Sequence, residues 1–143
     1  PVFESNPLRL EIIPAPENVA EKMKIMPGDP VIRCLRDMSD NGERTGVDVA
    51  YLDLATFRDL KIEDLEDVKG NLYKLYEEKL GVFIADVTDI LEFVIVDKEI
   101  QKICDLPLGT PLFFVTRQSR LLNKKTVEIR YEYCSAVNYR LRI

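Results

Sequence analysis

The chain has 143 residues, 46% of them hydrophobic, and its 25 acidic residues outnumber its 20 basic ones. This length suits a single domain with a sizeable core, and the apolar content argues against disorder. The acidic balance argues against a surface that binds a nucleic-acid backbone, which needs clustered lysine and arginine. The sequence has no histidine, which excludes Ser-His-Asp and Cys-His nucleophile systems and the zinc sites that use histidine.

The first part of the chain predicts a strand, a short helix and a hairpin. Val19, Met23 and Met26 recur at helical spacing, which predicts core positions, and Pro27-Gly28 then ends the helix in a turn. In chain order, we expect a strand at 8–13, this helix, a strand at 31–38, a polar loop at 39–44 and a return strand at 47–52.

The middle of the chain predicts a link between two halves. We expect residues 53–70 to form a charged surface segment without sustained periodicity. A helix follows, with Asn71 as its N-cap and Gly81 as its end. The apolar run at 81–96 is interrupted by acidic residues and does not suit a membrane span.

The last part of the chain repeats the pattern of the first. Ile100, Ile103 and Cys104 give a second short helix, and a Pro-Gly turn again follows it. In chain order, we expect a strand at 90–96, this helix, a strand at 112–120, a polar loop at 122–125 and a return strand at 126–134.

The two halves align without a gap when the sequence is shifted by 81 positions, the separation of Pro30 and Pro111. The shift places Arg36 over Arg117. With one residue dropped at the hairpin turn, Asp48 lies over Glu128. Two copies are too few for a solenoid. We therefore expect one domain over residues 1–143, with pseudo-symmetric halves at about 8–53 and 89–134, joined by 54–88. The halves should share one antiparallel sheet, with the outgoing strands at 31–38 and 112–120 near its centre.

The cysteines and the missing motifs narrow the chemistry further. Cys34, Cys104 and Cys134 are scattered in apolar segments without CxxC spacing, which indicates reduced core thiols of a cytoplasmic protein. No Walker loop is present, and no GxGxxG follows a predicted strand. We therefore expect no cofactor, no metal site and no enzymatic activity.

Three segments carry a family resemblance. They are KIMPGDPVIRCLRDMSDNGERTGVDVAYL from Lys24, NLYKLYEEKLG from Asn71, and LPLGTPLFFVTRQSR from Leu106 with TVEIRYEY after it. Their order and spacing resemble the UTRA (UbiC transcription regulator-associated) domain of HutC-type regulators in the GntR superfamily. The resemblance implies a chorismate lyase-like α+β fold, a homodimer and a pocket for a small effector. It also implies a repressor whose winged-helix DNA-binding domain precedes these residues and is absent from this chain.

The resemblance also implies a set of ligand-contacting residues. Arg36 stands at the first arginine of the family's R-L-R motif, Asp48 at its acidic position, and Tyr139 at its late tyrosine. Arg117 and Glu128 join this set because the repeat places them over Arg36 and Asp48. We expect these five residues to contact the effector, with Arg36 and Asp48 at the centre of the pocket.

Several positions depart from the family pattern of phosphosugar sensors. Met38 replaces the second arginine of R-L-R, and Ser135, Val137 and Asn138 replace Arg, Asp and Arg near the end. A phosphate dianion needs several charge-assisted donors, and three cationic positions are lost here. We therefore expect an effector with a single anionic group, such as a carboxylate, together with a hydroxyl or an amine.

Other interpretations stay open at this point. Arg36 could form only a surface ion pair with Glu43 or Asp48, worth ~0–1 kcal/mol. Glu128 could simply neutralise an arginine on a neighbouring strand. A lyase of the same fold could use Arg36, Arg117 and Glu128 on chorismate, and a dimerisation module would need no ligand. Because the chain is acidic, we expect these residues alone not to bind DNA.

Overall fold

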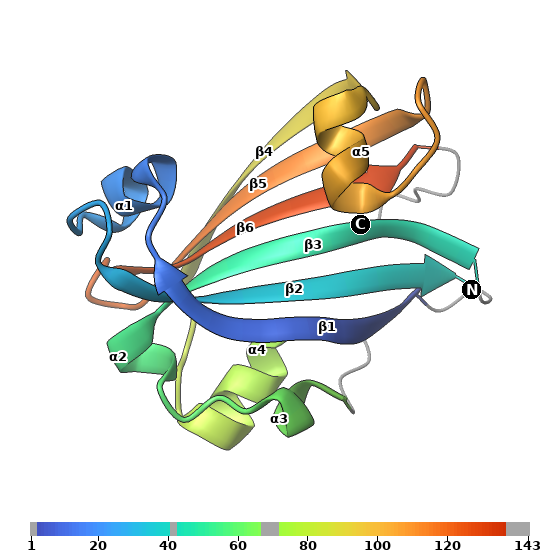
Figure 1. The fold of residues 1–143 in the computed structure, drawn as a ribbon. Helices are drawn as coiled ribbons and strands as arrows, with labels where there is room; N and C mark the ends of the chain where they lie inside the picture. The colour runs from blue at the N-terminus through green and yellow to red at the C-terminus, as the bar shows by residue number, and fades with distance from the viewer. Residues whose placement is uncertain (1–2, 41–42, 67–71, 137–143) are drawn as a thin grey trace.

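Six antiparallel strands form one sheet in the order β1-β2-β3-β6-β5-β4, with helices on both faces (Figure 1). The computed structural model describes residues 3–40, 43–66 and 72–136. The elements are β1 (Phe3–Pro14), α1 (Glu17–Met23), β2 (Pro30–Asp40), β3 (Glu43–Asp53), α2 (Leu54–Phe57), α3 (Ile62–Glu66), α4 (Leu72–Leu75), the π-helical turn η1 (Tyr76–Leu80), β4 (Asp86–Ile95), α5 (Lys98–Cys104), β5 (Pro111–Arg120) and β6 (Thr126–Ser135). The expected α+β class with a mainly antiparallel sheet is confirmed.

The strand order reads as two three-stranded halves that meet at β3 and β6. The expectation that both halves share one sheet is therefore confirmed. The expectation that the outgoing strands lie near the centre is wrong. β2 already pairs with β1 on one side and β3 on the other, and β5 is held in the same way by β4 and β6. The outgoing strands therefore have no free edge, and the halves join through the return strands β3 and β6.

The repeat extends to the backbone of the helix ends and turns. Lys24 and Asp105, which lie 81 positions apart, both cap their helices in the left-handed conformation, with φ of 57° and 50°. Gly28 and Gly109 share the same offset and have φ of 90° and 86°, which suits glycine at these turns. The Ala15 N–H donates to Asp29 O at 2.8 Å, and its counterpart in Val96 donates to Thr110 O at 2.9 Å. The alignment at 81 positions is thus correct up to the hairpins.

The return strands follow a different offset from the expected one. Arg36 lies opposite Asp48 in β2–β3, whereas Arg117 lies opposite Arg130 in β5–β6. The second hairpin is therefore one residue longer, and the structural counterpart of Asp48 is Arg130, 82 positions later. The predicted equivalence of Asp48 and Glu128 is wrong. It followed the likeness of residue types, whereas the register follows the length of the turn.

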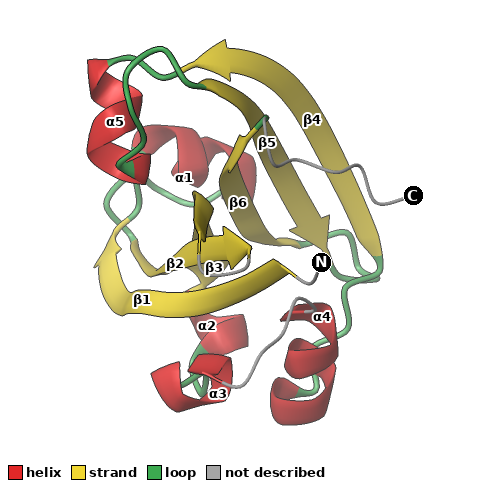
Figure 2. Cartoon of the chain, turned by 90° about the vertical axis from the view of Figure 1, so that its right-hand side faces the viewer, coloured by secondary structure: helices red, strands yellow, loops and turns green. Residues whose placement is uncertain are grey.

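The two faces of the sheet are covered by different helices (Figure 2). Helices α2, α3 and α4 with η1 cover one face, in a core cluster that includes Phe57, Leu65 and Tyr76. Helices α1 and α5 cover the other face. Each of them packs across the boundary between the halves, since α1 contacts β6 and α5 contacts β3.

Three local predictions can be compared with this packing. Gly81 ends η1 with φ of 66°, as expected, while Asn71 lies outside the described residues. The charged side chains of residues 54–66 are mostly exposed, as expected, but α2 and α3 form in this segment and bury Phe57 and Leu65. Met26 is 70% exposed rather than part of the core, because the left-handed residue Lys24 ends α1 before it.

The cysteines are free thiols, with Cys34 and Cys104 buried and Cys134 partly buried. Burial raises the pKa of Cys34 to about 11 and that of Cys134 to about 12. The thiols of Cys34 and Cys134 are therefore protonated at neutral pH and weakly nucleophilic. Among the described residues, no helix is long and apolar enough to cross a membrane.

Candidate functional site

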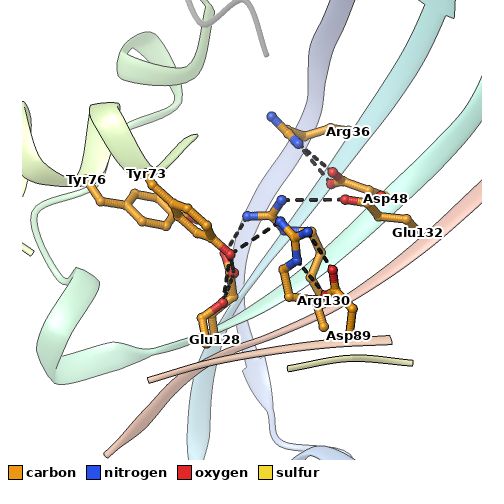
Figure 3. Close-up of polar contacts among 10 residues, drawn as sticks. Arg36, Asp48, Tyr73, Tyr76, Asp89, Glu128, Arg130 and Glu132 are labelled. Atoms are coloured by element: carbon orange, nitrogen blue, oxygen red, sulfur yellow. Dashed lines mark hydrogen bonds and ion pairs between the residues drawn. The ribbon is translucent and has the colours of Figure 1, made fainter. Parts of the chain in front are cut away.

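A band of charged side chains crosses the central strands on the face that α4 and η1 cover (Figure 3). Alternation along the strands places them on one face, since residues two apart point the same way. We call this set the charged band; it consists of Arg36, Asp48, Asp89, Arg117, Glu128, Arg130 and Glu132.

Arg36 and Asp48 form a buried pair across β2 and β3. Arg36 Nε donates to Asp48 Oδ1 at 3.1 Å, and a terminal nitrogen donates to Oδ2. Their side chains are only 7% and 1% exposed. Burial alone would lower the pKa of Arg36, but the adjacent Asp48 carboxylate outweighs it, so the pKa is raised. The sequence prediction that these two residues lie together is correct, although the pair is buried rather than at the surface.

Glu128 is the most enclosed carboxylate of the charged band. It accepts hydrogen bonds from Tyr76 Oη at 2.7 Å, Ser119 Oγ at 2.7 Å and Arg130 at 2.8 Å. Burial would raise its pKa, but Arg130 and these hydrogen bonds keep the pKa below its usual value. The same surroundings raise the pKa of Tyr76 well above its usual value, first through burial and then through the Glu128 charge. Glu128 is therefore an ionised, fully bonded anchor.

Tyr73 from α4 lies between the two arginines of β5 and β6. The guanidinium carbons of Arg117 and Arg130 lie 5.9 Å and 5.6 Å from the centre of its ring, within the range of a cation–π contact. Its hydroxyl lies 2.9 Å from Ser119 Oγ and 3.3 Å from Glu128 Oε1. Tyr73 thus links α4 to Arg117 on β5 and to Arg130 on β6.

Arg117 holds the outer end of the charged band. Its Nε and one terminal nitrogen donate to the two oxygens of Asp89 on β4, each at 2.8 Å, and the other terminal nitrogen contacts Tyr73 Oη at 3.4 Å. The side chains of Arg117 and Asp89 are 27% and 41% exposed. The hydrogen bond from Arg117 lowers the pKa of Asp89. This end of the charged band is therefore partly exposed to solvent.

Glu132 lies directly opposite Asp48 in the β3–β6 pairing. It contacts Arg130, whose terminal nitrogen is 3.5 Å from Oε1. Burial raises the pKa of Glu132, and the neighbouring Asp48 charge adds to the effect. With its side chain 23% exposed, Glu132 is a second point at which solvent reaches the charged band.

The structure brings four of the five predicted site residues into or next to one network. Arg36 contacts Asp48, while Arg117 and Glu128 are joined through Tyr73. The fifth, Tyr139, lies outside the described residues, as does Val137.

Sequence reasoning missed several members of this network, namely Tyr73, Tyr76, Asp89, Arg130 and Glu132. One signal was available: Glu128, Arg130 and Glu132 alternate along a single predicted strand, which places three charges on one face. For a strand in the middle of a sheet, such a pattern indicates buried, paired charges.

The arrangement suits noncovalent binding. Each of the four carboxylates in the charged band, on Asp48, Asp89, Glu128 and Glu132, contacts an arginine. In residues 3–40, 43–66 and 72–136, no cluster of three Cys, Asp or Glu side chains could hold a metal ion. Guanidinium and carboxylate groups held on a rigid sheet can recognise a small polar molecule through charge-assisted hydrogen bonds.

Comparison with known proteins agrees with this fold. The family model of the UTRA domain matches residues 2–140. The ligand-binding domain of a protein assigned to the GntR family of transcriptional regulators in Bordetella bronchiseptica is 28% identical, with a TM-score of 0.85 over 99% of this chain and 89% of that one.

Two more distant structures share the fold. The C-terminal domain of Yurk from Bacillus subtilis is 22% identical, with a TM-score of 0.78 over 96% of this chain and 94% of that one. PhnF from Mycobacterium smegmatis is 17% identical, with a TM-score of 0.79 over 98% of this chain but 61% of PhnF. The chain thus belongs to the UTRA domain family, and it has the fold of effector domains from GntR-family regulators.

Proposed function

We propose that this chain is the effector-binding domain of a HutC-type transcription repressor that works in the cytoplasm. A small molecule binds at the partly exposed end of the charged band, beside Arg117 and Asp89, and alters DNA binding by a winged-helix domain that lies outside this chain. The match to the UTRA domain across residues 2–140 is the observation that carries this proposal.

The charged band supports a binding role on physical grounds. A buried ion pair such as Arg36–Asp48 adds little to stability compared with apolar packing, because both charges lose their hydration. Arg130 Nε is also buried and has no hydrogen-bond partner in the described part of the chain, and such orphaned donors are uncommon in folded proteins. Perturbed, closely packed charges of this kind gather at functional sites.

The expected anionic group of the effector has one favoured partner in the charged band. Arg36 and Arg130 are nearly covered, whereas the Arg117 side chain is 27% exposed. We propose that a single anionic group binds Arg117. A phosphate dianion is disfavoured, because every arginine of the charged band already faces a carboxylate.

Dimerisation is the second part of the proposal. Strand β4 is at the edge of the sheet, and exposed apolar side chains line it: Val87, Ile90, Leu91, Phe93 and Ile95. An apolar edge strand of this kind invites pairing with another chain. A symmetric protein also suits the two-fold operators that such regulators read. Light scattering should report a dimer, and Phe93→Lys should shift it towards the 16.5 kDa monomer.

Ligand binding is tested by thermal shift with a panel of small carboxylates, amino acids, sugar phosphates and chorismate. We expect a carboxylate-bearing compound to stabilise the protein, by about 2.7 kcal/mol at a hundredfold excess over Kd. Arg117→Gln should remove the shift. Arg120→Gln is the matched control, since Arg120 lies on the same strand and also pairs with a β4 aspartate, Asp86.

Two outcomes would contradict the proposal. Stabilisation by no compound in the panel would leave a dimerisation module without a ligand. Release of 4-hydroxybenzoate from chorismate would instead identify a lyase of the same fold. The family match and the regulator domains of the same fold support a protein that is not an enzyme.

A further inference from the structure

The arginines of the charged band have little capacity left for an anion. Arg36 and Arg117 each use Nε and a terminal nitrogen, the edge of the guanidinium that best fits a carboxylate, on Asp48 and Asp89. Arg130 directs its terminal nitrogens at Glu128 and Glu132. An anionic group can therefore approach the outer side of Arg117 but finds no unoccupied fork in these contacts.

The carboxylates of the charged band differ in how well they are satisfied. Glu128 accepts three hydrogen bonds of 2.7–2.8 Å. Within the described part of the chain, Glu132 has only the 3.5 Å contact with Arg130, which is longer than an ordinary N–H···O bond. Glu132 thus offers acceptor capacity at a point that solvent reaches.

The charge balance of the charged band points the same way. Its three arginines face four carboxylates, Asp48, Asp89, Glu128 and Glu132. The excess negative charge acts most strongly on Glu132, because Glu132 lies directly opposite Asp48 and like charges in that position repel. A ligand that adds a positive charge beside Glu132 relieves this repulsion, whereas a purely anionic ligand increases it.

We propose that the effector is a small amino-acid-like zwitterion, whose protonated primary amine binds the Glu132 carboxylate while its carboxylate binds Arg117. The inference rests on the proposed function and specifies the chemistry of the ligand at the same site. Arg117 and Glu132 lie on neighbouring strands and two positions apart in register. The Cα atoms of such diagonal neighbours are about 7–8 Å apart, a gap that a short molecule with charges at both ends can bridge. A zwitterion also leaves the net charge of the network unchanged.

The test compares matched sets of probes by isothermal titration and thermal shift. The zwitterions are the twenty common amino acids, β-alanine and γ-aminobutyrate. The matched single ions are propionate and ethylamine for β-alanine, and butyrate and propylamine for γ-aminobutyrate. For any other hit, the probes are the same carbon chain without the amine and without the carboxylate. We expect at least one zwitterion to bind, and to bind at least tenfold more tightly than either of its single-ion partners.

Two variants test whether the amine of the ligand binds Glu132. Glu132→Gln keeps the shape of the side chain and should weaken the best zwitterion at least tenfold, while its single-carboxylate partner should bind no more weakly than before. Glu92→Gln is the matched control, because Glu92 is an exposed glutamate on β4, and it should bind like the unaltered protein. Circular dichroism and the thermal midpoint without ligand establish that each variant is folded.

The outcomes separate this inference from the proposed function. If simple carboxylates bind as tightly as the zwitterions and depend on Arg117, the proposed effector-binding function is supported but the proposed amine contact with Glu132 is wrong. If Glu132→Gln binds the best zwitterion with unchanged affinity, the assignment to Glu132 is overturned. If no charge class binds, the proposed function fails and the zwitterion fails with it.

Discussion

Asp48 and Arg130 occupy the same place in the two halves of the sheet but carry opposite charges. In the first half, the arginine of the outgoing strand therefore faces an aspartate, and the pair neutralises itself. In the second half, Arg117 faces Arg130, and both need carboxylates from elsewhere: Asp89 and Glu128 supply them. This single difference turns a symmetric pair of ion pairs into an asymmetric network that is partly exposed to solvent at Arg117 and Asp89.

Removing the Asp48 charge should destabilise the protein strongly. Asp48→Asn breaks the buried ion pair with Arg36, and breaking such a pair costs about 3–5 kcal/mol. Urea denaturation measures the loss. Asp86→Asn, which removes the exposed partner of Arg120, should cost no more than ~1 kcal/mol. Equal losses in the two variants would mean that Arg36 is solvated after all.

Removing the Tyr76 hydroxyl should cost less but still be clearly measurable. Tyr76→Phe preserves the ring that packs on Phe57 while depriving the buried Glu128 of a 2.7 Å hydrogen bond. We expect a loss of about 1–3 kcal/mol in the free energy of unfolding. Tyr51→Phe is the control, because Tyr51 contacts Tyr131 through its ring, and it should change stability by less than ~0.5 kcal/mol.

Stability should fall in acid through Glu128. The folded-state pKa of Glu128 lies below its usual value of 4.5, so the ionised form stabilises the fold. This contribution is complete above the unfolded pKa and is lost as pH falls through the folded pKa. Thermal midpoints measured from about pH 6 to about pH 3 should drop less steeply in Glu128→Gln than in the unaltered protein. Parallel curves for the two proteins would contradict the assignment.

Ionisation of Glu132 should have the opposite effect on stability. Burial and the Asp48 charge raise its pKa, so its contribution is complete below the unfolded pKa and is lost as pH rises through the folded pKa. Without ligand at neutral pH, Glu132→Gln should therefore raise the free energy of unfolding by about 0.2–1 kcal/mol, the size of a cross-strand repulsion. A destabilised Glu132→Gln would show that the ion pair with Arg130 outweighs that repulsion.

Gly46 should not tolerate a side chain. A Cβ atom at this position would lie 1.7 Å from the backbone oxygen of Tyr133, where β3 passes closely by β6. Gly46→Ala should cost at least about 1–3 kcal/mol, because backbone cannot move aside as a side chain can. Gly28→Ala, which meets no atom within 4 Å, should show only the strain of its positive φ, about 1–2 kcal/mol.

Much of the fold could be predicted because the repeat is written in local signals. The strand, helix and turn before each hairpin align without a gap, so matched apolar spacings and Pro-Gly turns were enough. The return strands could not be aligned in this way. Their offset depends on hairpin length and on bulges between Met38 and Ser39 and between Ser119 and Arg120, which composition does not reveal.

The site was only partly predictable for the same reason. Arg36 and Asp48 could be paired because one hairpin joins them. Tyr73 and Asp89 reach Arg117 from α4 and from the edge strand, and such contacts depend on how separate elements pack. The buried state of Arg36 likewise depends on tertiary packing, which the pattern of a single strand does not reveal.

The crossed packing of α1 on β6 and of α5 on β3 has a consequence for how this duplicated chain folds and unfolds. Each half consists of consecutive strands and could form its hairpins early, since those contacts are local. Neither half, however, covers its own return strand on this face. Ile129 of β6 is buried against α1 from the first half, and Val47 of β3 is buried against α5 from the second. The halves are therefore not independent folding units. Despite its internal duplication, the domain should unfold in one cooperative transition, and a chain cut between the halves should gain structure only when the two pieces are mixed.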